Sequence, residues 1–200
     1  PGIAPLYTMG KGVDGRLYYT MKPLQGVSLE DLLLKWKKKD SQIIKEYNLF
    51  KLVHILLKAS ETVAYAHSQE IAHLDIHPAN IIVGEFGEIT LIDWGKGVKL
   101  NEKQPETNTT GVYVSGSPVY RAPEQLKSGL NGKFTDVYSL GIILYEILTD
   151  KTPFKKDSTR DTIEAIINGV DQTILNDEIY QGSDPLLATA CKSAIMKDPL

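Results

Sequence analysis

The chain has 200 residues, which is enough for one good-sized hydrophobic core or two small ones. Lys plus Arg number 22 and Asp plus Glu number 25, so the formal net charge of −3 argues against a general nucleic-acid-binding coat. Hydrophobic residues at 42% and charged residues at 24% exclude wholesale disorder, and the longest apolar stretch, 140–145, is far too short to cross a bilayer. The single cysteine, Cys191, excludes an internal disulfide and fits a reducing compartment.

The N-terminal part of the chain predicts a hairpin followed by a capped helix. Residues 16–21 (RLYYTM) are rich in aromatic and β-branched side chains and follow a turn at 14–15 (Asp-Gly), so they predict the second strand of a hairpin. Ser28 followed by Asp31 is typical of a helix N-cap with an acidic first turn. We therefore expect a helix over residues 29–39.

The middle of the chain predicts a long amphipathic helix and a pair of strands. Apolar residues recur at helical spacing over residues 49–67, which predicts a helix with one buried face. Residues 81–83 and 89–92 are short apolar runs joined by a glycine-containing loop, and they predict two short strands.

The C-terminal half combines an irregular segment with three predicted helices. Residues 93–134 lack sustained periodicity and are rich in Gly, Thr, Ser and Pro, which indicates a long functional loop. Residues 135–149 are apolar nearly all round and predict a buried central helix. Two more helices are expected at 160–168 and 186–196, the latter holding Cys191 as a small buried apolar residue.

Three polar side chains in the middle of the chain predict a metal-assisted site. Asp75 and Asn80 belong to a proline-containing loop before the first of the paired strands, and Asp93 closes the second. Each of these residue types alone is commonly a turn former. Together they offer hard oxygen ligands for Mg²⁺ beside a free carboxylate, and Mg²⁺ is normally held by one or two carboxylates plus substrate phosphates. Their joint spacing therefore indicates phosphate chemistry.

Four ordered motifs that cover most of the chain carry a family resemblance. They are HLDIHPAN at 73–80, DWG at 93–95, GSPVYRAPE at 116–124 and DVYSLG at 136–141. The chain resembles the large C-terminal lobe of a protein kinase, where the first three patterns read H-R-D-L-x-x-x-N, D-F-G and A-P-E. The D-W-G variant resembles bacterial Ser/Thr kinases in particular.

The resemblance implies an α+β, protein-kinase-like fold with a mainly helical C-lobe, a small β-hairpin or sheet and a remnant of the N-lobe sheet. It implies that residues 1–21 are the last strands of the N-lobe, 22–26 the hinge, and 27–200 a C-lobe that is incomplete at its C-terminus. The sequence shows neither the Gly-rich loop nor the strand lysine with its helix glutamate partner. We therefore expect the isolated chain to be an inactive fragment.

The resemblance also implies ATP- and Mg²⁺-dependent phosphoryl transfer to Ser/Thr hydroxyls of proteins. Asp75 would accept or orient the proton of the substrate hydroxyl, and Asn80 and Asp93 would hold Mg²⁺ on the ATP phosphates. Ser117 matches the hydroxyl that Ser/Thr kinases keep beside the catalytic Asp, although a turn serine before proline is the alternative. The adenine site would comprise Met21, Lys22 and Leu24 of the hinge and Ile82 as an apolar floor.

Two positions depart from the family pattern. Leu74 replaces the Arg that pairs with a phosphorylated activation loop, so phosphates on Thr107, Thr109 or Thr110 are not expected to switch the protein on in the usual way. His77 replaces the Lys that contacts the transferring phosphate in Ser/Thr kinases, and a neutral imidazole supplies less charge there.

These departures leave two alternatives beside the protein kinase. One is a pseudokinase, which would bind ATP or act as a scaffold. The other is a small-molecule phosphotransferase, because the pattern HxDxHxxN followed by IDWG also resembles aminoglycoside- and choline-type enzymes. The motifs GSPVYRAPE and DVYSLG favour the protein kinase. The resemblance further implies a cytoplasmic catalytic domain in bacterial signalling, with no nucleic-acid partner and with membrane attachment only through regions outside this chain.

Overall fold

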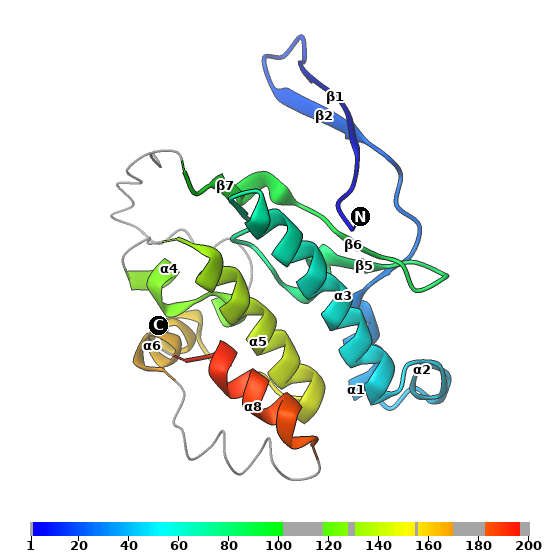
Figure 1. Cartoon of the computed structure of the whole chain (residues 1–200), viewed down its shortest axis with the longest axis vertical. Helices are drawn as coiled ribbons and strands as arrows, with labels where there is room; N and C mark the ends of the chain where they lie inside the picture. Colours follow the sequence, from blue (N-terminus) through cyan, green and yellow to red (C-terminus); the bar gives the residue numbers. More distant parts are fainter. Residues whose placement is uncertain (1, 102–117, 128–130, 155, 170–182, 197–200) are drawn as a thin grey trace.

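The computed structural model describes residues 2–101, 118–127, 131–154, 156–169 and 183–196. It is an α+β fold with a mainly helical body and three small sheets (Figure 1). The elements are β1 (Leu6–Lys11), β2 (Leu17–Met21), β3 (Val27–Ser28), α1 (Leu29–Lys37), α2 (Ser41–Glu46), α3 (Leu49–Ser68), β4 (Ile71–Ala72), η1 (Pro78–Asn80), β5 (Ile81–Val83), β6 (Ile89–Leu91), η2 (Trp94–Lys96), β7 (Val98–Lys99), η3 (Pro118–Tyr120), α4 (Pro123–Lys127), α5 (Lys133–Thr149), α6 (Thr159–Asn168) and α8 (Pro185–Ala194). Ser117, Thr107, Thr109 and Thr110 lie outside the described residues.

The N-terminal hairpin projects from the helical body (Figure 1). Strands β1 and β2 pair in antiparallel fashion, with Met9 opposite Tyr19, which confirms the hairpin that the Asp-Gly turn predicts. All five residues of β2 are exposed to solvent, including Leu17 and Tyr19. The hairpin therefore joins the body through its base, and its strands bury little of their own apolar surface.

The central small sheet forms one wall of the body and has two different faces. Its strand order is β3–β5–β6, and both pairings are antiparallel. Ile81 and Val83 of β5 are buried in the core, whereas Ile82 between them is only half-buried and lies opposite Thr90 of β6. Because side chains alternate along a strand, one face of the sheet packs on the core and the other is open for binding.

Helices α1 and α3 begin at the caps that their sequences provide. The Ser28 hydroxyl accepts the backbone N–H of Asp31 at 3.0 Å, which confirms the predicted N-cap of α1. The helix ends at Lys37, two residues before the expected position. Helix α3 has 20 residues and buries one face, as its periodicity predicts. Among the residues that the structure describes, no helix is both long and apolar enough to cross a membrane.

Helix α5 is the centre of the molecule and contributes to two hydrophobic clusters. Ile143 and Ile147 belong to the first cluster, with α1, α3, β5 and β6. Tyr138, Ile142 and Tyr145 belong to the second, with α6, α8 and residues 119–126. Helices α3 and α8 flank α5 in Figure 1, and both contact it. The buried central helix predicted at 135–149 is thus confirmed, with its start two residues earlier.

Other parts of the described structure differ from the sequence-based expectation. The segment 93–134 is not a continuous irregular loop, since its described residues include η2, β7, η3 and α4. Strands β4 and β7 pair across a long sequence separation, Ala72 with Val98, so neither has a local signal. Cys191 is fully buried in α8, and burial raises the pKa of its thiol to about 12. It is therefore the small apolar core residue that was expected.

Gly141 permits the close approach of α5 and α8, and enlarging it should destabilise the fold. A Cβ at this position would lie 2.6 Å from Ala194 Cβ and 2.7 Å from Ile195 Cγ2. We expect Gly141→Val to lower the free energy of unfolding by about 2 kcal/mol, because overpacking typically costs about 1–3 kcal/mol. Urea denaturation measures this loss. The control is Val137→Ala, at an exposed position of the same helix, and its free energy of unfolding should stay within about 0.5 kcal/mol of the wild-type value. Equal stability of both variants would contradict the packing argument.

Candidate functional site

The predicted catalytic loop, residues 73–80, connects β4 to β5 and ends in the single turn η1. Asp75 lies in its middle, with a side chain that is 13% exposed. One carboxylate oxygen, Oδ2, accepts a hydrogen bond from Lys96 Nζ at 2.8 Å. The Asp75 carboxylate is thus largely buried, and one of its oxygens is paired with an ammonium from η2.

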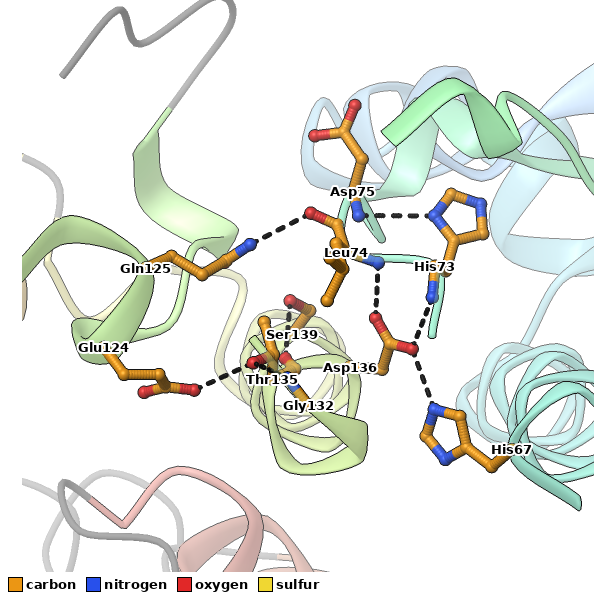
Figure 2. A network of polar contacts seen from close by, with 10 residues as sticks. All are labelled: His67, His73, Leu74, Asp75, Glu124, Gln125, Gly132, Thr135, Asp136 and Ser139. Atoms are coloured by element: carbon orange, nitrogen blue, oxygen red, sulfur yellow. Dashed lines mark hydrogen bonds and ion pairs between the residues drawn. The ribbon is translucent and has the colours of Figure 1, made fainter. Parts of the chain in front are cut away.

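A buried carboxylate from α5 holds the backbone of this loop (Figure 2). Asp136 is 1% exposed and accepts the backbone N–H of His73 on Oδ2 and that of Leu74 on Oδ1, both at 2.8 Å. Its Oδ2 also lies 2.8 Å from Nε2 of His67 on α3. Three donors from the loop and from a second helix therefore converge on one carboxylate, which positions Asp75 relative to the central helix.

Leu74 has a strained backbone conformation, which a hydrogen bond from Gln125 supports in addition to the bond to Asp136. Its φ of 64° lies in the left-handed region, which disfavours a side chain with a Cβ. The Leu74 carbonyl accepts a hydrogen bond from Gln125 Nε2 at 3.0 Å (Figure 2), while Gln125 Oε1 accepts the backbone N–H of Ala122. Leu74 is also 8% exposed, so it is a buried apolar residue where the family pattern has Arg.

His73 links the loop to the DWG segment. Its Nδ1 accepts the backbone N–H of Asp75 at 3.3 Å, so the proton sits on Nε2, which donates to the carbonyl of Ile92 at 2.9 Å. The imidazole also lies against the Trp94 ring, with 4.5 Å between the centroids. Burial lowers the pKa of His73, so the neutral ring is the form that this geometry requires.

Asn80 and Asp93 are the two residues predicted to hold a metal ion. The Asn80 side chain donates from Nδ2 to the backbone carbonyl of Asp75 at 2.9 Å, which leaves its Oδ1 as an acceptor. Asp93 is exposed, with a left-handed φ of 59°, and its charge acts on both His73 and His77. Within the described part of the chain, no three His, Cys, Asp or Glu side chains form a metal cluster. One carboxylate and one amide oxygen suit a Mg²⁺ ion that phosphates co-ligate.

His77 is a half-buried imidazole whose ring is 6.4 Å from that of Tyr120. Burial lowers the pKa of His77, and the nearby charge of Lys96 lowers it further. The charges of Asp75, Glu30 and Asp93 act in the opposite direction but do not overcome burial. His77 is therefore neutral at pH 7.

The depressed pKa of His77 predicts a loss of stability in acid. Above the unfolded-state pKa of about 6.5 the imidazole is neutral in both states. As the pH falls through that value, the unfolded chain binds a proton that the folded chain does not, so the free energy of unfolding decreases until the lower folded pKa is reached. We expect urea denaturation at pH 7.5 and 5.5 to show this decrease, and His77→Gln to reduce it.

His54→Gln is the control for this comparison, because its imidazole is exposed on α3. It should leave the difference between the two pH values unchanged. An equal decrease in the wild-type protein and in His77→Gln would show that other groups carry the pH dependence.

Beside residues 22–25, a cavity of about 630 Å³ brings together three of the residues predicted to bind adenine. Lys22 and Leu24 line it on one side, and Ile82 and Thr90 line it from the open face of the central sheet. Tyr7 of β1 also contributes. Met21, the last residue of β2, is not among the lining residues. Thr90 and Tyr7 were not predicted, because no motif marks them.

A second buried carboxylate of α5 fixes the elements that flank the loop. Glu146 accepts the Lys37 ammonium on Oε1 and the Tyr120 hydroxyl on Oε2, both at 2.6 Å. Burial and the Glu146 charge raise the pKa of Tyr120 well above its usual value, so its hydroxyl stays protonated. Together with Glu30 and Pro78 these three residues line a cavity of about 220 Å³ beside η1.

Sequence reasoning identified the loop and DWG residues but missed several of the partners that hold them. Asp75, His77, Asn80 and Asp93 lie together as the motif spacing requires, whereas Ser117 is outside the described residues. Lys96, Gln125 and His67 were missed. The only feature of the sequence that marks these residues is that they lie near a motif, and nearness in sequence does not reveal a contact.

Comparisons with known proteins point to one family. Residues 3–195 match the model of the protein kinase domain. The chain is similar to the serine/threonine-protein kinase PknD of Protochlamydia amoebophila, with 33% identity over 175 residues, 78% of this chain and 18% of that protein. It is also similar to PknD of Chlamydia muridarum, with 30% identity over 225 residues, 100% of this chain and 23% of that protein. The chain thus spans about a fifth of the length of these curated relatives.

Proposed function

Because this chain belongs to the protein kinase domain family, we propose that it is the ATP-dependent phosphate-transferring part of a Ser/Thr protein kinase of the bacterial type. The observation that carries the proposal is the position of Asp75, a carboxylate on a loop that Asp136 holds by two backbone hydrogen bonds. Residues 1–21 would be the last strands of an N-lobe, 22–26 the hinge and 27–200 a C-lobe.

The reaction moves one phosphoryl group between two oxygens. A Ser or Thr hydroxyl attacks the γ-phosphorus of ATP, the new O–P bond forms as the bond to the β-phosphate oxygen breaks, and ADP leaves with that electron pair. The hydroxyl proton passes to a carboxylate oxygen of Asp75 and from there to solvent. The hydrogen bonds to Asp136 and the Gln125 contact at Leu74 support this role, because they fix the two residues that directly precede Asp75.

Asn80 Oδ1 and the Asp93 carboxylate would hold Mg²⁺ on the ATP phosphates. A bound Mg²⁺ neutralises charge on the phosphate oxygens. The donor chemistry of these two residues fits the ion, since both offer hard oxygen atoms. The adenine would enter the cavity between Leu24 and Ile82, whose apolar side chains suit a flat aromatic ring.

The acceptor would be a protein with a Ser or Thr hydroxyl, as the names of the PknD relatives suggest for those proteins. Ser117 remains a proposed neighbour of the acceptor. The proposal includes a cytoplasmic catalytic part, because ATP is supplied there, and a role in bacterial signalling. It includes no nucleic-acid partner, because the formal net charge of −3 does not favour binding to a polyanion.

Phosphate transfer from γ-labelled ATP tests the proposal. The natural gene product, with any sequence that flanks these residues, is incubated with Mg²⁺ and a generic basic protein, and Asp75→Asn is the blank. Label on phosphoserine or phosphothreonine that the blank lacks supports the Ser/Thr kinase. Transfer to choline or an aminoglycoside instead would favour the small-molecule enzyme. No transfer, with ATP still bound, would favour the pseudokinase.

A further inference from the structure

The catalytic loop brings no positive charge of its own to Asp75. His73 is neutral, since its Nδ1 accepts the backbone N–H of Asp75 and its Nε2 donates to Ile92. Leu74 is apolar and buried. His77, two residues after Asp75, is kept neutral at pH 7 by burial. Phosphoryl transfer nonetheless concentrates negative charge on the oxygens of the moving group, and cations at that point lower the barrier.

A cation reaches Asp75 from a different segment. Lys96 is the last residue of η2, directly after the DWG motif, and its Nζ lies 2.8 Å from Asp75 Oδ2. The Lys96 side chain is 42% exposed and so keeps donors free for a second partner on the open side of the loop. Its charge also lowers the pKa of His77.

We propose that Lys96 supplies the positive charge of the active centre: its ammonium positions the Asp75 carboxylate and contacts the terminal phosphate of ATP, in place of a cation from the catalytic loop. This inference rests on the proposed phosphate transfer. The γ-phosphorus must come within bonding distance of the hydroxyl that Asp75 orients, so an ammonium that already touches Asp75 is next to the phosphate oxygens. Lys96 is a positioning residue toward Asp75 and an electrostatic partner of the phosphate.

Steady-state kinetics of the natural gene product test the proposal with variants that remove the charge of Lys96 and restore a charge at position 77. We expect Lys96→Met to lower kcat about 100-fold, as loss of one such donor does elsewhere, and to change KM for the protein acceptor much less. Lys96→Arg, which keeps the charge, should recover part of kcat. The double variant Lys96→Met/His77→Lys should also recover it, because the new ammonium stands beside the same carboxylate. Lys45→Met, an exposed lysine of α2, is the matched control and should retain full activity.

Two results would overturn the assignment of Lys96. Unchanged or higher kcat in Lys96→Met would mean that the ion pair is dispensable or blocks Asp75. A loss that neither Lys96→Arg nor the double variant repairs, in proteins with wild-type melting temperatures, would mean that Lys96 has only a structural role.

Nucleotide binding separates failure of this inference from failure of the proposed function. If the wild-type protein transfers no phosphate, calorimetry with Mg²⁺ and either ADP or a non-hydrolysable ATP analogue still measures the phosphate contact. Lys96→Met should reduce the preference for the analogue about tenfold, which is the usual contribution of a charge-assisted hydrogen bond. An unchanged preference would overturn the inference. Failure of the wild-type protein to bind either nucleotide would overturn both proposals.

Discussion

Asp136→Asn should lower the free energy of unfolding by about 3 kcal/mol, because a buried carboxylate that accepts several hydrogen bonds has no neutral substitute. The carboxylate is 1% exposed and its two oxygens take N–H groups from His73 and Leu74. An asparagine amide has one oxygen, so its NH₂ group must point at one of these backbone donors. The side chain volume is unchanged, so the loss isolates hydrogen bonding from packing.

The same substitution should also reduce phosphate transfer at temperatures where the protein remains folded. Leu74 holds a left-handed φ of 64°, a conformation that costs about 1–2 kcal/mol in a residue with a side chain. Without the Asp136 bond, Leu74 can relax to an ordinary conformation, and that relaxation displaces Asp75.

Chemical denaturation and the transfer assay, run on the same preparations, measure these two effects. Glu70→Gln is the matched control, since Glu70 pairs with Lys133 at 2.8 Å but with both side chains at least 40% exposed. A surface ion pair of this kind contributes about 0–1 kcal/mol. Equal stability of Asp136→Asn and Glu70→Gln would contradict the view that Asp136 organises the loop.

Asp75→Asn should have the opposite profile: transfer reduced by about 10³-fold and stability nearly unchanged. Asparagine cannot take the hydroxyl proton, and general-base catalysis typically contributes about 10²–10⁴-fold. Stability should change by about 1 kcal/mol or less, because asparagine has the same volume and keeps an oxygen that can accept the hydrogen bond from Lys96.

Initial rates of transfer and calorimetric binding of an ATP analogue are the measurements for Asp75→Asn. Binding should be preserved, since Asn80 and Asp93 are intact. Asp157→Asn, an exposed carboxylate before α6, should leave the rate unchanged. A rate within about tenfold of wild type for Asp75→Asn would show that another group takes the proton.

The sequence predicted those parts of the molecule whose cause is local. Helix α5 was recognised because its residues are apolar all round, and α1 because Ser28 and Asp31 form a cap. Strands β4 and β7 exist only through their mutual pairing, and α2 is a helix of only six residues capped by Asp40, so none of the three had a periodic signal.

The residues of the site also divide into those with a local sequence signal and those without one. Asp75, Asn80 and Asp93 belong to motifs with fixed spacing and could be identified from the sequence. Their supporting contacts join residues 21, 51 and 69 positions apart, from Lys96 to Asp75, Gln125 to Leu74 and His67 to Asp136. Only the folded chain brings such pairs together, because no spacing rule connects them.

The hydrogen bond between Gln125 and the Leu74 carbonyl has a consequence for how quickly the protein can be controlled. It joins two uncharged groups at 3.0 Å and is part of the fold as soon as the chain folds. A phosphate that braced this loop could be attached or removed by another enzyme within minutes, whereas an amide and a carbonyl offer nothing to add or remove. We therefore expect this contact to stay constant for as long as the chain is folded, and no modifying enzyme to change it directly.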